Sequence, residues 1–183
     1  FTMLEFYWAY VDYQVLMRFT EELLSFVARA AVGAEQVAFG DHQISLQAPF
    51  RRLSLRHAAA EEASKRLGVP VLVEELRSLD SARAIAARLG IEVAPSAGPG
   101  KVATGIFEAL WEDQLIQPTF IYDFPTEVSP LSKQRQDDPD TVERFELYIG
   151  GFEVANAFSE LNDPVEQRRR FEEQLAGRAK GDD

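Results

Sequence analysis

Hydrophobic and polar residues alternate in several parts of the chain, and this alternation predicts β-strands there. The clearest alternating segments lie at residues 1–10 and 144–160. A shorter hairpin is predicted over residues 36–46 and a strand bounded by prolines over residues 118–125. In the first segment, one face of the expected strand carries Phe1, Met3, Glu5 and Tyr7.

Helical spacing of apolar residues predicts two helices next to these strands. The first follows Asp12, which can cap it, and ends near Gly33. Its expected apolar stripe consists of Val15, Leu16, Phe19, Leu23, Phe26 and Val27. The last helix begins after Asn162 or Asp163, with Pro164 at its first position. Its expected apolar contacts are Val165, Phe171 and Leu175.

The middle of the chain has a different composition, since it is rich in Ala and Glu and poor in β-branched residues. Three short helical segments lie there, and the first two end at Gly68 and Gly90. We therefore expect residues 50–115 to form a small helical insertion. Residues 1–49 and 116–183 would form the core, which makes the predicted fold class α+β, an antiparallel sheet flanked by helices.

Composition narrows the possible chemistry. The chain has 183 residues, enough for one domain, and no cysteine, which excludes disulfides and thiolate catalysis. Its formal charge of -11 argues against nucleic-acid binding by bulk electrostatics. We interpret the basic runs Arg168–Arg170 and Arg51-Arg52 as a solvated helix face and a loop. No apolar run approaches the length of a membrane span, so we expect no membrane association.

The C-terminal hairpin concentrates the candidate chemistry. Its two arms carry Glu146, Glu153, Asn156, Phe158 and Glu160, interleaved with other aromatic residues. Glu153 has the opposite parity to Asn156, so a regular strand would point the two side chains to opposite faces. A β-bulge near residues 154–155 would bring them to one side. We predict this bulge if Glu153 and Asn156 belong to one site.

Two interpretations of these carboxylates are open. In the first, they occupy the wet face of a half-exposed antiparallel sheet. In the second, they bind a cationic ligand, because the strands lack balancing positive charges. A Mg²⁺ ion bound to ATP would suit Glu146 and Glu153. An ammonium group would suit a second set, formed by Glu5, Tyr7, Asn156 and Glu160.

Three stretches together resemble a known family: FTMLEFYWAYVDY, LIQPTFIYDFPTEVSPLSK and RFELYIGGFEVANAFSELNDP. They are similar, in order and in detail, to the catalytic domain of bacterial class II lysyl-tRNA synthetases, over essentially the whole chain. The resemblance implies a class II synthetase-like sheet and a ligase that activates lysine with ATP and transfers it to tRNA(Lys). It also implies Mg²⁺ as cofactor, a homodimer at full length and a cytoplasmic location.

The resemblance also implies roles for individual residues. Phe1 would stack on the adenine of ATP, and Glu5 and Tyr7 would contact the substrate lysine. Glu146 and Glu153 would be the catalytic residues that hold magnesium and ATP. The lysine pocket would be lined further by Asn156, Phe158 and Glu160.

Some features depart from the family pattern. Many relatives have glycine on both sides of the asparagine, where this chain has Ala155 and Ala157. The motif 1 elements, the motif 2 arginine and the motif 3 residues are not in the sequence. We therefore expect an internal fragment of the catalytic domain that is inactive alone. Two alternatives remain: a paralogous ligase that attaches lysine to elongation factor P, and a non-catalytic synthetase-like module.

Overall fold

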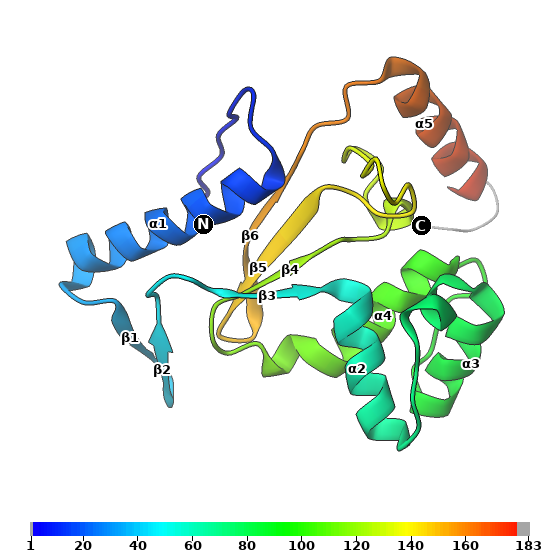
Figure 1. Cartoon of the computed structure of the whole chain (residues 1–183), viewed down its shortest axis with the longest axis horizontal. Helices are drawn as coiled ribbons and strands as arrows, with labels where there is room; N and C mark the ends of the chain where they lie inside the picture. Colours follow the sequence, from blue (N-terminus) through cyan, green and yellow to red (C-terminus); the bar gives the residue numbers. More distant parts are fainter. Residues whose placement is uncertain (1, 179–183) are drawn as a thin grey trace.

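A computed structural model describes residues 2–178 of the chain, with side chains described as far as residue 175. A mixed sheet of four strands lies at its centre, in the order β3-β4-β5-β6 (Figure 1). Its strands are β3 (Arg51–Ser54), β4 (Thr119–Tyr122), β5 (Arg144–Ile149) and β6 (Phe152–Phe158). Strand β5 is antiparallel to both neighbours, whereas β3 and β4 are parallel. The α+β class is confirmed.

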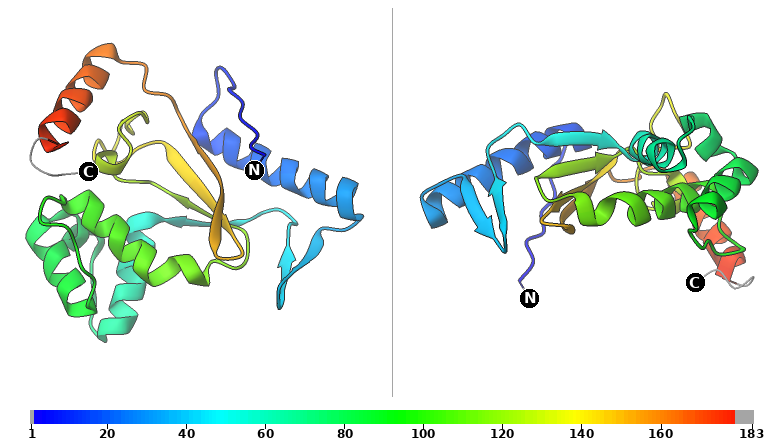
Figure 2. Two further views of the ribbon diagram at one scale, coloured as in Figure 1. Left: turned by 180° about the vertical axis from the view of Figure 1, so that it is seen from behind. Right: turned by 90° about the horizontal axis from the view of Figure 1, so that it is seen from below.

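The two faces of the sheet pack against different helices. On one face, Phe120, Phe145 and Leu147 form a core with Tyr13 and Met17 of α1 (Tyr13–Val32). On the opposite face, the helical side of the molecule forms a larger core that includes α4 (Pro99–Trp111). Seen from below, α1 and α4 lie on either side of the sheet (Figure 2, right). Helices therefore cover both faces of this short sheet.

Helix α1 has the predicted ends but buries a different stripe. The Asp12 carboxylate accepts a hydrogen bond from the Val15 amide at 2.9 Å, and Gly33 ends the helix at a φ of 79°. The buried positions are Tyr13, Met17, Glu21, Ser25 and Ala28. The predicted stripe was wrong for Phe26 and Val27, which are exposed, whereas Leu16 packs against the core. Glu21 can be buried because its carboxylate accepts from the Phe50 amide and pairs with Arg52.

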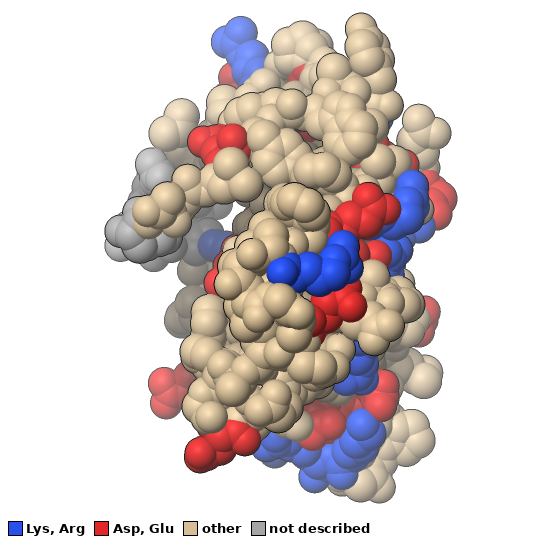
Figure 3. Space-filling view, turned by 90° about the vertical axis from the view of Figure 1, so that its left-hand side faces the viewer, with Lys and Arg blue, Asp and Glu red and all other residues tan. Residues whose placement is uncertain are grey.

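The displaced stripe leaves apolar residues of α1 in solvent. Phe26 and Val32 are each more than half exposed. The face of the molecule that presents α1 and the small hairpin is mostly uncharged, with acidic and basic side chains in scattered groups (Figure 3).

The small hairpin is as predicted, with β1 (Gln36–Phe39) antiparallel to β2 (His42–Ser45).

A cluster of helices follows β3, as expected. Its elements are α2 (Leu55–Leu67), η1 (Val73–Arg77), α3 (Leu79–Leu89), α4 and η2 (Glu112–Gln114). Gly68 and Gly90 end α2 and α3 in the left-handed conformation, as the sequence predicted. The expected insertion over residues 50–115 was wrong at its start, because residues 51–54 form the strand that pairs with β4. Arg51 and Arg52 are therefore strand residues and do not lie in a loop.

The start of α4 is fastened to the polar connection between β4 and β5. Glu127, in η3 (Thr126–Val128), accepts hydrogen bonds from the Gly98 and Gly100 amides at 2.8 Å each and from the Lys101 amide at 3.3 Å. A Cβ atom on Gly98 would lie 2.6 Å from a carboxylate oxygen of Glu127. The glycine thus admits the carboxylate that caps the helix.

The expected N-terminal strand is absent from the described residues. Residues 2–8 are assigned to no strand, and all of them are exposed. The prediction was wrong because alternation supplies a strand pattern, but a strand also needs a pairing partner. Phe6 and Trp8 contact the ring of Phe19 on α1 instead, with centroids 5.4 and 5.6 Å away.

The C-terminal helix α5 (Pro164–Arg178) is held by a polar contact. Asp163 accepts from the Val165 and Glu166 amides, as the capping prediction required. Its predicted apolar contacts were wrong, because all three side chains are exposed: Val165, Phe171 and Leu175. Arg170 is buried instead and donates to the carbonyls of Ser129, Pro130 and Ser132. Within residues 2–178, no helix has the length and apolar character needed to span a membrane.

Candidate functional site

The predicted bulge is present in β6 and is confirmed. Glu146 pairs with Asn156 and Leu147 with Ala155, but Tyr148 pairs with Glu153, so Val154 is the extra residue. Directly paired residues point to the same face of a sheet. The bulge therefore places Glu146, Glu153 and Asn156 on one face, which also carries Arg144 and Phe158.

Glu146 is the buried centre of this face. Its Oε2 accepts from the Tyr148 hydroxyl at 2.8 Å, and its Oε1 pairs with Arg144. Burial raises the pKa of Glu146; Arg144 and Tyr148 oppose that shift, whereas the charges of Glu153 and Glu108 add to it. Burial thus disfavours the ionised carboxylate, and a cation bound beside it would stabilise the ionised form.

Arg144 connects Glu146 to two other parts of the site. Its Nε donates to Asn156 Oδ1 at 3.3 Å, and its Nη1 donates to Ser129 Oγ at 2.8 Å. The guanidinium also lies over the ring of Phe124, 4.6 Å from the centroid. Arg144 was not among the candidate residues, although its parity with Glu146 in the sequence could have indicated it.

Three of the remaining candidates, Glu5, Tyr7 and Glu160, are exposed. Tyr7 donates a hydrogen bond to Glu5 Oε1 at 2.7 Å, and this bond is the main cause of its raised pKa. The charge of Glu160 also raises the Tyr7 pKa, so these groups from opposite ends of the chain act on one another. The backbone of Glu160 is bridged to Ser132. Phe1 lies outside the described residues.

The residues that would hold a metal ion are few. Among the described residues, no group of three or more His, Asp or Glu side chains is arranged to hold a metal. Glu146 and Glu153 still offer hard oxygen donors on one face, and Glu108 of α4 adds a third negative charge nearby. Two carboxylates suit Mg²⁺ that takes its other ligands from phosphates and water.

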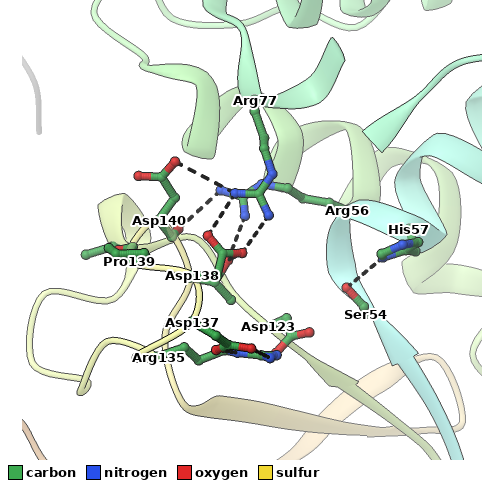
Figure 4. A network of polar contacts seen from close by, with 12 residues as sticks. Ser54, Arg56, His57, Arg77, Asp123, Arg135, Asp137, Asp138, Pro139 and Asp140 are labelled. Atoms are coloured by element: carbon green, nitrogen blue, oxygen red, sulfur yellow. Dashed lines mark hydrogen bonds and ion pairs between the residues drawn. The ribbon is translucent and has the colours of Figure 1, made fainter. Parts of the chain in front are cut away.

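A second polar cluster lies between the helical cluster and the β4–β5 connection (Figure 4). It borders a cavity of about 260 Å³ lined by Ser54, Arg56, His57, Val73, Arg77, Asp123, Arg135, Asp137, Asp138 and Thr141. Arg77 donates to both carboxylate oxygens of Asp138, at 3.0 and 2.6 Å. Arg135 pairs with Asp123 and Asp137 at 2.7 Å each. These matched charges favour a structural connection over a ligand site.

The pKa shifts in this cluster follow from the same pairs. The hydrogen bonds from Arg77 lower the pKa of Asp138 to about 2. Burial lowers the pKa of Arg56, and the nearby charge of Arg77 lowers it further. Arg56 donates to Thr141 Oγ1 at 2.9 Å, while its buried Nε has no hydrogen-bond partner among the described residues. Asp138 is therefore the group whose ionisation supports the cluster.

Comparisons with known proteins identify the class of protein to which this chain belongs. The family of class II tRNA synthetases for D, K and N matches residues 1–182, and the chain belongs to that family. Within it, the chain is 46% identical over 183 residues to the lysine–tRNA ligase of Moorella thermoacetica. It is 44% identical over 183 residues to that of Haemophilus influenzae strain PittGG, and 45% identical over 182 residues to that of Chromohalobacter salexigens.

These alignments cover all of the chain but only part of the relatives. The chain spans 36% of the length of the Moorella and Haemophilus proteins and 35% of the Chromohalobacter protein. The suspected family is therefore confirmed, and the aligned region corresponds to about a third of each relative.

Proposed function

We propose that the chain provides part of the lysine and ATP site of a lysine–tRNA ligase. The full-length protein would activate lysine with ATP to lysyl-adenylate and transfer it to tRNA(Lys). The observation that carries the proposal is the bulge at Val154, because it gathers Glu146, Glu153 and Asn156 on one face. The names of the aligned relatives support the same function.

In this proposal Glu146 and Glu153 hold the magnesium ion that accompanies ATP. The fit rests on their oxygen donors and on the burial of Glu146, which raises its pKa and is reinforced by the charges of Glu153 and Glu108. Bound magnesium would neutralise charge on the triphosphate. Arg144 and the Tyr148 hydroxyl keep the Glu146 carboxylate oriented toward the shared face.

The lysine side chain would lie between the exposed carboxylates. Glu160 and the Glu5–Tyr7 pair come from opposite ends of the chain and interact electrostatically through Tyr7. Carboxylates on two sides suit an ammonium group, and the half-buried ring of Phe158 suits the methylene stem. An ion pair at about 4 Å contributes roughly 4 kcal/mol at an effective dielectric of ~20, before desolvation is subtracted.

The reaction itself needs no nucleophile from the protein. The carboxylate of lysine would attack the α-phosphate of ATP, and pyrophosphate would leave. The protein would contribute alignment of the two substrates and stabilisation of charge. We further propose that the full-length protein acts as a homodimer in the cytoplasm, as the resemblance to the family implies.

The decisive test is Glu160→Gln in the full-length protein. We expect the KM for lysine to rise by at least about 10-fold, since the neutral amide loses an ion pair with the ammonium group. The KM for ATP should change little. Glu172→Gln on the exposed side of α5 is the matched control. An unchanged lysine KM would remove Glu160 from the pocket.

A second test uses the 183-residue chain alone. We expect negligible ATP–pyrophosphate exchange, because the chain covers about a third of each aligned relative. Robust exchange by the isolated chain would show that the site is complete without the remaining sequence.

A further inference from the structure

We propose that Arg144 is a positioning residue that fixes Asn156 as a hydrogen-bond donor toward an anionic oxygen of the substrates. This inference rests on the proposed function and deepens it. The sequence pattern placed Asn156 with Glu5, Tyr7 and Glu160 as ligands of an ammonium group. The present inference gives Asn156 a different ligand.

Arg144 is held in place from several directions. Its Nη1 donates to Ser129 Oγ at 2.8 Å and to the Val128 carbonyl at 3.3 Å. Its Nη2 pairs with Glu146 Oε1, and its guanidinium covers the ring of Phe124. The side chain is only 17% exposed. A planar guanidinium with this many fixed partners has little freedom to reorient.

The Nε donor of Arg144 determines how the Asn156 amide is oriented. Nε donates to Asn156 Oδ1 at 3.3 Å. Arginine has donors only, so the atom that faces it must be the oxygen of the amide. The Nδ2 group, with two N–H donors, is then left for a ligand. Asn156 is exposed, and its side chain makes no other hydrogen bond among the described residues.

An N–H donor can bind an acceptor atom but not a protonated amine. In the proposed reaction the acceptors are the lysine carboxylate and the phosphate oxygens of ATP. The two sources share one chemistry, an anionic oxygen, and can be told apart by the substrate whose binding weakens. Glu5 and Glu160, which have acceptors only, remain suited to the ammonium group.

The sharpest test is Asn156→Asp in the full-length protein, because the two roles predict opposite results. A carboxylate cannot donate, so the lysine or the ATP KM should rise by about 10- to 100-fold, the range for a lost hydrogen bond to a charged group. If Asn156 instead accepts from the ammonium group, the aspartate should leave lysine binding unchanged or tighten it. That result would overturn the inference.

A ligand comparison identifies the acceptor. L-lysinol keeps the side chain of lysine but has a hydroxymethyl group in place of the carboxylate. If the acceptor is the lysine carboxylate, Asn156→Asp should weaken lysine binding and leave the inhibition constant of lysinol nearly unchanged. If it is a phosphate, the ATP KM should rise and lysine should be unaffected. Equal weakening of lysine and lysinol would contradict the inference.

The positioning role of Arg144 is tested by combining its substitution with Asn156→Asp. Arg144→Lys removes the fork that joins Ser129, Asn156 and Glu146, and Ser129→Ala removes one anchor of the fork more mildly. Ser129→Ala should raise the same KM that Asn156→Asp raises and leave the other within about 3-fold, whereas Arg144→Lys should raise the ATP KM as well, because it also releases Glu146. Combined with Asn156→Asp, Ser129→Ala should add no further rise, and Arg144→Lys should be less than additive. Arg169→Gln, an exposed arginine on α5, is the matched control.

The outcomes separate this inference from the proposed function. If the unmodified full-length protein binds no lysine, the proposed function fails. If it binds lysine and Arg144→Lys is fully additive with Asn156→Asp, only the positioning role fails. If Arg144→Lys merely lowers the thermal midpoint and changes neither KM, the arginine is structural and the inference is likewise overturned.

Discussion

Removal of the Glu127 carboxylate should loosen the start of α4. Three backbone amides at this helix end depend on Glu127, and Gly98 supplies no capping side chain of its own. Loss of a helix cap costs about 0.5–2 kcal/mol. Three amides lose their acceptor, while water replaces part of it at this exposed position, so Glu127→Ala should cost about 1–2 kcal/mol. For a chain of 183 residues this corresponds to a fall of roughly 2–8 °C in Tm.

The assay combines urea unfolding with hydrogen exchange of the α4 amides. We expect the amides of Gly100 and Lys101 to lose protection first, since they donate to the carboxylate directly. Glu127→Gln keeps one acceptor oxygen and should have about half the effect. Glu172→Ala, at an exposed glutamate that pairs with Arg168, is the control.

Gly98→Ala tests the same contact without changing Glu127 itself. The alanine suits the backbone there, at a φ of -80°, but its Cβ would lie 2.6 Å from Glu127 and displace it. Gly98→Ala should therefore destabilise the protein with Glu127 present and be neutral or stabilising after Glu127→Ala. Equal destabilisation in both backgrounds, or no effect of Glu127→Ala, would refute this account of the helix end.

Three further predictions concern other contacts. Arg77 holds the Asp138 pKa at about 2, below the unfolded value of ~3.9. Asp138 therefore stabilises the fold above pH ~4, and this contribution is lost as the pH falls toward 2. Asp138→Asn should flatten that part of the plot of unfolding free energy, measured with urea, against pH. Arg170→Gln should destabilise the protein by about 2–3 kcal/mol and expose α5 amides to hydrogen exchange, whereas Arg169→Gln on the exposed side should change both little. Tyr148→Phe leaves the buried Glu146 oxygen without its donor and should lower the free energy of unfolding by about 1–3 kcal/mol, with Tyr122→Phe as control.

The sequence predicted elements whose ends and turns have local causes. Asp12 and Asp163 cap helices, and Gly68 and Gly90 end them, because these effects depend on neighbouring backbone atoms. The bulge near Val154 was predicted from parity, since a shared site requires it. Local chemistry of this kind can be read without knowledge of the tertiary packing.

The failures share a tertiary cause. Helix α1 buries Glu21, and a carboxylate can be buried there only because Phe50 and Arg52 supply hydrogen bonds from distant sequence. Residues 2–8 alternate like a strand but lack a paired strand among the described residues. Strand β3 was assigned to the insertion because its parallel partner, β4, lies more than 60 residues away. No pattern within a short window contains these partners.

The sequence predicted three residues of the candidate site but not the residues that contact them. Glu146, Glu153 and Asn156 were chosen by residue type and spacing, and the register brings them to one face. Arg144 and Ser129 were missed, because the value of an arginine depends on the several groups it joins. Glu108 was missed as well, since only the packing of α4 brings its charge near Glu146.

The extra residue in β6 could be deleted without changing which side chains share a face. Glu153 and Asn156 are three positions apart and share a face only because Val154 is not counted in the pairing. Deletion of Val154 would leave them two positions apart, a spacing that any regular strand turns to one side. A hairpin shorter by one residue would thus present the same side chains. What Val154 adds is the local twist of a bulged strand, and with it the angle between Glu153 and Asn156.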